Sequence, residues 1–266
     1  MGAPGPARVS RVGRLVEYRE VLVAMMRRDL LVRYRQSVMG VGWALLVPLS
    51  SMLVFTVVFT RVVPLETDVP YPLFAYAGLL AWTWLASSIQ FATTSLTGNM
   101  ALVTKVFFPR ALLPLSAVVV SLVDFVVASG LLIVLMVGYG IDFRPALLFA
   151  PVLLLIQFVL AYALALLVAL GNLFFRDVRF LVGVVVPLWM FVTPVVYPLE
   201  AADPDLRRVL VLNPATPLIE GWRAILFDGA IPAPASLGYA AAVATLLLLA
   251  AWRLFHRLEP RFAEMI

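Results

Sequence analysis

The chain changes from a charged segment to an apolar one at RRDLLVRYRQSVMG, Arg27–Gly40. The next 20 residues, Val41–Thr60, carry no charge. Because an α-helix rises about 1.5 Å per residue, a helix of this length crosses the roughly 30 Å hydrocarbon core of a bilayer. The sequence therefore predicts a membrane span that begins directly after a basic corner, and every later segment takes its orientation from that corner.

The segment before this corner has the pattern of an amphipathic helix. Its apolar residues recur at three- and four-residue spacing with charged residues between them, at Leu15, Tyr18, Leu22 and Met25. Such a pattern is typical of a helix that lies in the membrane interface. We predict an interface helix over Leu15–Gln36. The stretch before it, Met1–Arg14, is rich in Pro, Gly and Arg and is predicted to be disordered.

The composition is that of a polytopic, all-α membrane protein. The chain is 63% hydrophobic and 13% charged, and its mean hydropathy is +1.02. A soluble domain of 266 residues needs far more polar surface. We predict six transmembrane helices at about 41–60, 71–96, 112–136, 146–170, 182–197 and 237–255. The fifth is short and contains Pro187 and Pro194, so we expect it to be kinked or broken.

Lysine and arginine indicate which side of the membrane each loop faces. An even number of spans puts both chain ends on one side, and that side carries most of the 20 Lys and Arg residues. The other side carries Arg61, Arg144, Arg207, Arg208 and Arg223. Because basic residues gather on cytoplasmic loops, we predict an inner-membrane protein with cytoplasmic N and C termini. The basic excess then marks the cytoplasmic side of the membrane. Membrane lipids are an expected partner, and no nucleic-acid partner is predicted.

Several classes of chemistry are disfavoured by what the sequence lacks. It has no cysteine and no G-x-x-x-x-G-K-[ST] loop, so thiolate chemistry and a nucleotide site of that type are excluded from this chain. Its single histidine, His256, makes neither a metal site nor a triad, and we predict no catalytic residue and no metal. A membrane-embedded transferase or phosphatase would need a cluster of acids or histidines, which the sequence does not contain.

One acid, Asp124, falls within a predicted span. An intramembrane carboxylate is a functional-site hypothesis by default. A proton-driven carrier usually needs a relay of several such groups, however, and a single acid is a poor relay. We therefore predict a packing role, in which Asp124 bonds a polar group such as Gln157 on the fourth span.

Two loops on the predicted inner side mix large apolar residues with charge. These are Asn99–Ala111, with Val106, Phe107 and Phe108, and Gly171–Arg179, with Phe174 and Phe175. Such residues either anchor in the interface or are covered by a partner protein, and both readings stay open.

The predicted outer side carries one long connection, Pro198–Pro234. Asp203 can cap a helix that starts at Pro204, and Thr216 followed by Pro217 can start a second. Leu218, Trp222 and Ile225 share one face of that second helix. We predict two short amphipathic outer helices within 204–227.

Aromatic residues gather toward the same side and within the spans. Most fit an ordinary interfacial belt. Because aromatic faces also stack on sugar rings, a second reading is a carbohydrate path lined by Trp82, Trp84, Trp189, Phe191 and Tyr197.

The sequence resembles the membrane subunit of ABC exporters that move lipid-linked polysaccharide, the O-antigen and teichoic-acid type, within the ABC type-2 permease family. The resemblance runs from about Leu15 to the C-terminus. It is carried by RRDLLVRYRQSVMGVGWALLVP (27–48), LVTKVFFPR (102–110), GNLFFRDVR (171–179), NPATPLIEGWRAILF (213–227) and LEPRFAEM (258–265).

This resemblance implies a homodimer with six spans per protomer and a continuous channel. It also implies two copies of a separate ATPase subunit, which bind ATP and Mg, while this chain carries no cofactor. The residues expected to contact the ATPase are Thr104, Lys105, Val106, Phe107, Phe108, Arg110, Phe175, Arg176 and Asp177. An exporter of a small molecule or drug in the same wider family is the alternative function.

Two further sites follow from that implied function. Arg33 and Arg35 are placed to bind the pyrophosphate that joins lipid to sugar, because guanidinium pairs two phosphate oxygens. The alternative is that they are topology signals beside the first span, and the two roles stay open. The outer helices are expected to close the channel exit, with Arg208, Trp222 and Phe227 in this gate.

Overall fold

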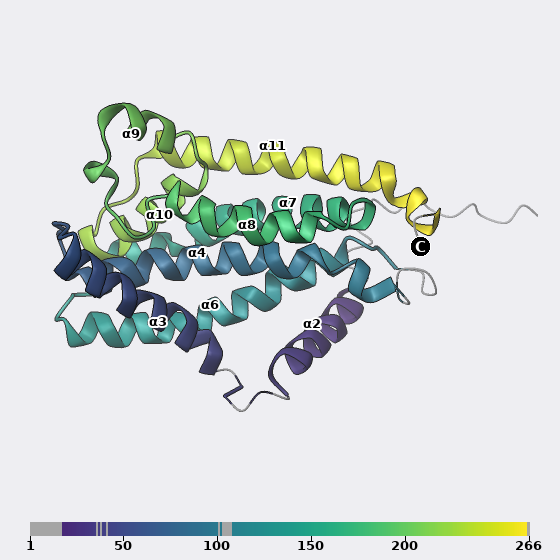
Figure 1. Ribbon diagram of the computed structural model, residues 1–266, viewed down its shortest axis with the longest axis horizontal. Helices are drawn as coiled ribbons and strands as arrows, with labels where there is room; N and C mark the ends of the chain where they lie inside the picture. Colours follow the sequence, from purple (N-terminus) through teal and green to yellow (C-terminus); the bar gives the residue numbers. More distant parts are fainter. Residues whose placement is uncertain are drawn as a thin grey trace, which may run out of the picture.

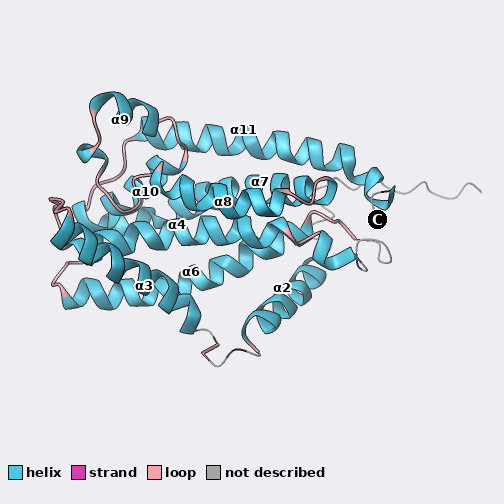
Figure 2. Cartoon of the chain, in the orientation of Figure 1, coloured by secondary structure: helices cyan, strands magenta, loops and turns pink. Residues whose placement is uncertain are grey.

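A computed structural model describes residues 18–35, 37, 39–40, 42–100, 102 and 108–264. All regular structure in these residues is helical (Figure 2). The predicted all-α class is therefore confirmed. Met1–Arg14, Thr104–Phe107 and both ends of the predicted interface helix lie outside the described residues.

The long helices run side by side, and short helical segments cap one end of the bundle (Figure 1). The main elements are α2 (Arg19–Tyr34), α3 (Gly42–Val57) with the π-helical turn η1 (Val58–Val62), α4 (Tyr71–Thr93), η2 (Thr97–Asn99), α6 (Leu112–Gly138), η3 (Pro145–Phe149), α7 (Ala150–Phe174), α8 (Val178–Phe191), η4 (Leu199–Ala201), α9 (Pro204–Leu210), α10 (Ala215–Arg223) with the π-helical turn η5 (Ala224–Asp228), and α11 (Pro234–Leu258) with η6 (Glu259–Glu264).

Five helices in the described part of the chain are long and apolar enough to cross a membrane. They are Gly42–Val62, Tyr71–Thr93, Leu112–Gly138, Pro145–Phe174 and Pro234–Phe262. Each overlaps one of the predicted spans and differs from it by a few residues at the ends. The sequence locates these helices well because each is an uninterrupted apolar run with charged or Pro/Gly-rich flanks.

The fifth predicted span differs from the structure. Its helix, α8, has 14 residues and covers Val178–Phe191 instead of 182–197. It passes through Pro187 and ends shortly before Pro194, because a proline disfavours helical backbone in the residue that precedes it. At about 1.5 Å per residue, α8 alone is shorter than a bilayer core.

Local sequence explains several helix starts. Asp203 caps α9 as predicted, and its side chain accepts a hydrogen bond from the backbone N–H of Asp205 at 3.4 Å. Proline occupies the first turn of α9 and of α11, where its missing N–H leaves no bond unmade. The chain leaves η5 through Gly229, whose φ of 66° favours glycine.

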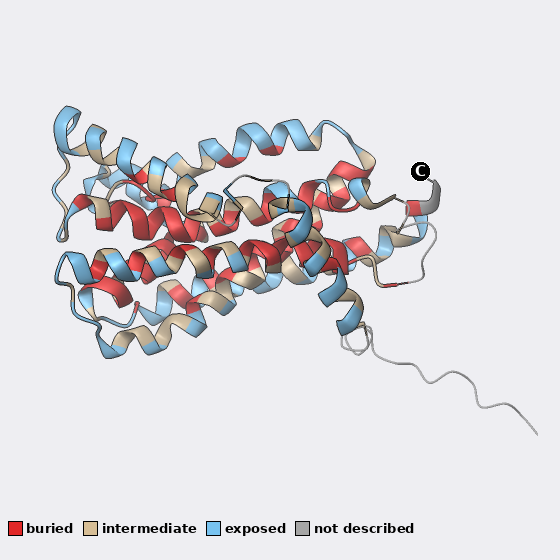
Figure 3. Ribbon diagram, turned by 90° about the horizontal axis from the view of Figure 1, so that it is seen from below, coloured by how far each residue is buried: buried red, intermediate tan, exposed pale blue. Residues whose placement is uncertain are grey.

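Helix α4 is the centre of the bundle. It packs against α3, α6, α7, α8 and α10, and it is buried along most of its length (Figure 3). Small residues at Ala75, Ala77, Gly78 and Ala81 let its neighbours approach closely. Helix α3 differs from α4, since only Pro48 and Met52 are buried and its other residues are exposed or partly exposed.

The two ends of the bundle differ. Helix α9 lies at the end where α3 finishes, and the C-terminus lies at the other end (Figure 1). Helix α2 lies outside the set of long helices and packs against α6. This packing places Asp29, Arg33 and Tyr34 against the side of the bundle.

Candidate functional site

Three polar contacts join α2 to α6. The hydroxyl of Ser116 donates a hydrogen bond to the carboxylate of Asp29 at 2.5 Å. One turn further along α2, Arg33 forms an ion pair with Asp124 on the same face of α6. A third side chain, Tyr34, donates its hydroxyl hydrogen to the other oxygen of Asp124.

These contacts correct the predicted partner of Asp124. Gln157 instead donates to the carbonyl oxygen of Ala81 at 2.7 Å and accepts from the indole N–H of Trp222 at 2.9 Å. A carboxylate in an apolar bundle is stabilised by a cation or by several hydrogen-bond donors. Arg33 and Tyr34 of α2 supply a cation and a second donor, whereas the amide of Gln157 carries no charge. The packing role predicted for Asp124 is consistent with this arrangement.

The aromatic and phenolic groups around the ion pair strengthen it. The guanidinium carbon of Arg33 lies 3.6 Å from the ring centroid of Phe91, a cation–π distance. Burial and the hydrogen bond to Asp124 raise the pKa of Tyr34 to about 12. Tyr34 therefore keeps its proton at neutral pH and remains a donor to the carboxylate.

The two arginines predicted to bind a pyrophosphate are in different situations. Arg33 is half-buried and engaged with Asp124, whereas Arg35, at the end of α2, is exposed. Among the described residues, no ion pair involves Arg35. A cavity of about 320 Å³ lies between α2, α3, α4 and α6, and Arg33 and Asp124 are part of its wall.

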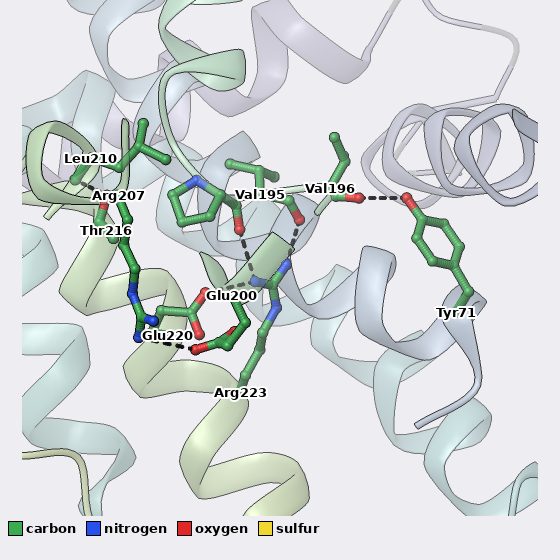
Figure 4. A network of polar contacts seen from close by, with 10 residues as sticks. Tyr71, Val195, Val196, Glu200, Arg207, Leu210, Thr216, Glu220 and Arg223 are labelled. Atoms are coloured by element: carbon green, nitrogen blue, oxygen red, sulfur yellow. Dashed lines mark hydrogen bonds and ion pairs between the residues drawn. The ribbon is translucent and has the colours of Figure 1, made fainter. Parts of the chain in front are cut away.

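A second polar cluster lies at the other end of the bundle and centres on Arg223 (Figure 4). The side chain of Arg223 is only 5% exposed. It donates to the carbonyl oxygens of Pro194 at 2.7 Å and Val195 at 2.5 Å, and it pairs with Glu220 at 2.8 Å. Its guanidinium carbon also lies 3.6 Å from the ring centroid of Phe74. Arg223 thus joins α10 to the turn that follows α8.

Helix α4 fits closely against this cluster. A Cβ atom on Gly78 would come within 2.7 Å of Arg223 Nη2 and closer still to the carbonyl oxygen of Val195. Seven residues earlier, the hydroxyl of Tyr71 donates to the carbonyl oxygen of Val196 at 2.6 Å. Only glycine at position 78 lets the turn and the arginine approach this face of α4.

The charges of this cluster shift one another. Burial lowers the pKa of Arg223, and Glu220 opposes that shift. Burial raises the pKa of Glu220, and Arg223 opposes that shift in turn. Glu200 and Arg207, which pair at 3.5 Å, connect the cluster to α9. From sequence alone, Arg223 is assigned only to the outer side, and its i, i+3 spacing from Glu220 is the one signal of a pair within a helix.

The two predicted outer helices are present as α9 and α10, with one correction. Thr216 does not cap α10, because the helix begins at Ala215 and the Thr216 hydroxyl donates to the carbonyl oxygen of Leu210 at 2.7 Å. The face predicted from Leu218, Trp222 and Ile225 is buried.

The three residues assigned to the outer gate separate into two groups. Trp222 and Phe227 point into the bundle and are buried, whereas Arg208 is exposed and pairs with Asp205 at 3.0 Å. Of these two short helices, α10 is therefore packed into the bundle and α9 is exposed.

The five aromatic residues predicted to line a channel do not share one surface. Trp82 and Trp84 are buried, and Trp84 lies 5.2 Å from Phe125 between ring centroids. Trp82 meets Trp189 edge to face at 5.4 Å, so these two are brought together. Tyr197 is half-buried, and Phe191 is 53% exposed at the end of α8.

The residues predicted to contact an ATPase also separate. Phe108 is buried, and Arg110 donates to the carbonyl oxygen of Glu259 at 3.0 Å, so this part of the loop packs on the C-terminal segment. Phe175, Arg176 and Asp177 are exposed, with Phe175 at 71%. Thr104, Lys105, Val106 and Phe107 lie outside the described residues.

Comparison with known proteins gives a match over most of the chain. The profile of the ABC-2 type transporter family matches residues 20–227. The chain belongs to the ABC-2 type transporter family. The matched part runs from α2 to η5 and so includes both polar clusters of this ABC-2 permease.

The similarity extends to curated members of this family over nearly the whole chain. The ABC-2 permease is 36% identical over 258 residues to the O-antigen export system permease protein RfbA of Myxococcus xanthus, covering 96% of this chain and 98% of that protein. It is 28% and 27% identical over 252 residues to two Klebsiella pneumoniae proteins of the same name. Each of these alignments covers 93% of this chain and 95% of the relative.

Proposed function

We propose that this chain is the permease subunit of an ABC exporter that moves a lipid-linked polysaccharide, of the O-antigen or a related cell-envelope type, across the cytoplasmic membrane. The observation that carries this proposal is the similarity to O-antigen export permeases, which runs through 96% of the chain and 98% of the Myxococcus xanthus protein. The same similarity favours a polysaccharide over a small molecule or drug as the cargo.

In this proposal the permease works as a homodimer. The outer surfaces of α3 and α8 support this, because both are apolar and largely uncovered, with Leu53, Val54, Val184 and Leu188 exposed. Such surfaces suit lipid or a second copy of the chain. A channel between two protomers would bring Phe191 and Tyr197 to its wall, with Trp189 behind them.

The proposed topology has six spans with both termini in the cytoplasm. In addition to the five long helices, α8 and the segment that continues toward Pro198 form one span. The buried helix α10 packs against α4 and α7, which α8 also contacts. The distribution of Lys and Arg supports a cytoplasmic position for the end that carries the C-terminus. Helix α2 then lies at the cytoplasmic interface, and α9 and α10 form the outer gate.

Energy would come from a separate ATPase, two copies of which bind ATP and Mg. The exposed loop Phe175–Asp177 supports a docking position on the cytoplasmic end, and Thr104–Arg110 is the second proposed contact. Closure of the ATPase would push on these loops and shift the equilibrium between two arrangements of the spans. The contacts of α2 with Ser116 and Asp124 would carry such a shift to the basic corner. There Arg35, which is exposed, would bind the pyrophosphate, and Arg33 would do so only by exchanging its pairing with Asp124.

The proposal is tested by deleting the gene in the source strain. We expect surface polysaccharide to disappear while its lipid-linked form accumulates inside the cell. The wild-type gene should restore export only when the partner ATPase keeps its nucleotide-binding lysine. A deletion strain with normal surface polysaccharide and a new sensitivity to small toxic compounds would instead favour the drug-export alternative.

A further inference from the structure

The cavity beside the Arg33–Asp124 ion pair has walls of two kinds. Its volume of about 320 Å³ falls in the range of about 300–1,000 Å³ that is usual for small-molecule sites. Aromatic rings from three helices face it, belonging to Trp43, Phe91 and Phe125. Between them lie hydroxyl and charged groups, which is the mixture that fixes the orientation of a polar ligand. Trp43 is 51% exposed, so the cavity reaches the surface where α3 begins.

One fully buried hydroxyl in this wall has no hydrogen-bond partner in the described part of the chain. Ser121 is fully buried on α6, and its Oγ makes no hydrogen bond. The other buried serines are hydrogen-bonded, Ser116 to the carboxylate of Asp29 and Ser88 to the carbonyl oxygen of Trp84 at 2.7 Å. A buried polar group is normally bonded, so the free hydroxyl of Ser121 indicates a partner that comes from outside the chain.

The charge of the cavity favours a neutral ligand. Arg33 and Asp124 neutralise each other, so the wall has no net charge from this pair. An anion entering here would meet the carboxylate of Asp124, whose repulsion is strong in a region of low dielectric constant. An apolar tail would leave the hydroxyls of Ser121 and Ser87 without partners. A polyol fits both kinds of wall, because its hydroxyl groups bond the polar side chains and its apolar ring face packs on the aromatic rings.

We propose that this cavity is a saccharide subsite, which takes a sugar residue next to the pyrophosphate of the lipid-linked cargo. This inference rests on the proposed function. The sugar ring stacks on the aromatic side chains, donates to the free lone pairs of Asp124 and bonds the hydroxyl of Ser121. The exposed Arg35, beyond the end of α2, is then the cation left for the pyrophosphate.

The first test compares two fully buried serines, of which only Ser121 lines the cavity and lacks a hydrogen bond among the described residues. Ser121→Ala removes an unpartnered hydroxyl, and Ser88→Ala removes an equally buried hydroxyl bonded within its own helix. The complete permease–ATPase complex is reconstituted with lipid-linked polysaccharide extracted from the source strain. We expect Ser121→Ala to raise the concentration for half-maximal ATPase stimulation about fivefold, as loss of one neutral hydrogen bond does. Ser88→Ala should leave it unchanged, and neither variant should melt much earlier than the wild type.

The second test identifies which part of the cargo occupies the cavity. The chain has no cysteine, so Ser87→Cys places a single thiol in the wall, and Ser129→Cys places one on α6 outside it. We expect lipid-linked polysaccharide to slow maleimide labelling at position 87, but not at position 129. A polyisoprenyl pyrophosphate without sugar should slow neither.

The outcomes separate the subsite from the proposed function. Equal protection by the sugar-free lipid, absence of protection at position 87, or a Ser121→Ala complex with unchanged half-saturation would overturn the saccharide assignment. If lipid-linked polysaccharide neither stimulates the ATPase of the wild-type complex nor slows labelling at position 87, the proposed function itself fails.

Discussion

Arg33 on α2 pairs with Asp124 on α6, 91 residues further along the chain. The pair joins the helix before the basic corner to the interior of a membrane-crossing helix. Both side chains are only partly exposed, at 17% and 21%, so their attraction is screened less than that of a surface pair. The position of α2 relative to the bundle therefore depends on a polar contact as well as on apolar packing.

The first prediction concerns the carboxylate of this pair. Asp124→Asn should retain most export, because an amide oxygen still accepts hydrogen bonds from Arg33 and Tyr34. Asp124→Leu leaves both donors without a partner and should destabilise the permease by about 1–3 kcal/mol. Thermal unfolding in detergent and surface polysaccharide measure the two effects. Loss of export by a well-folded Asp124→Asn complex would contradict a packing role.

The second prediction separates headgroup binding from topology at the corner. In the Arg33→Lys, Arg35→Lys double variant, both positive charges remain, so insertion should be normal. Lysine cannot pair two phosphate oxygens or stack as well on Phe91, so export should fall. More lipid-linked polysaccharide should then be needed to saturate the ATPase. Because Arg35 has no ion pair among the described residues, Arg35→Lys alone tests the headgroup role without disturbing Asp124. Normal export by the double variant would leave both arginines as topology signals.

The third prediction concerns ATPase docking. Replacing Phe107 and Phe108 by Ala should lower ATPase recruitment or uncouple hydrolysis from export, but Phe108 is buried, so that change also removes packing. Phe175→Ala is the cleaner variant, since Phe175 is 71% exposed. It should reduce the amount of ATPase that copurifies while the melting temperature stays the same. Leu148→Ala, at a residue that is 85% exposed on η3, is the matched control. Full recovery of ATPase with Phe175→Ala would place the contact elsewhere.

The fourth prediction concerns the close approach of α4 to the Arg223 cluster. Gly78→Ala inserts a methyl group against Val195 and Arg223 and should destabilise the permease by about 1–3 kcal/mol. Gly130→Ala is the control, because a Cβ atom there meets no atom within 4 Å, and alanine favours a helix. The melting temperature of Gly78→Ala should therefore fall, whereas that of Gly130→Ala should stay the same or rise. Equal melting temperatures would show that the turn can move away from α4.

The fifth prediction concerns the side of the membrane that α9 faces. Arg208 is exposed, and the chain has no cysteine of its own, so Arg208→Cys introduces one accessible thiol. A membrane-impermeant thiol reagent should label it when added from outside intact spheroplasts. Loss of the pairing with Asp205 should not matter, because an exposed i, i+3 pair contributes little. Labelling only from the cytoplasmic side would overturn the proposed topology.

The sequence by itself determined the features that depend on neighbouring residues. An uncharged run after the basic corner predicted a span at 41–60, and the helix covers Gly42–Val62. The Asp203–Pro204 pair predicted the start of α9, which begins there. Both follow from short-range physics, since apolar length sets a span and a capping side chain bonds N–H groups within its own first turn.

Only the tertiary structure decided which distant groups meet. Asp124 bonds Arg33 and Tyr34 instead of Gln157, and Phe108 is covered by its own chain. Arg223 is buried among carbonyl groups of a turn that begins 29 residues before it, a position that its own helix does not predict. The physical reason is that a buried polar group bonds whatever donor or acceptor packing brings within reach, and the crossing of helices sets that choice.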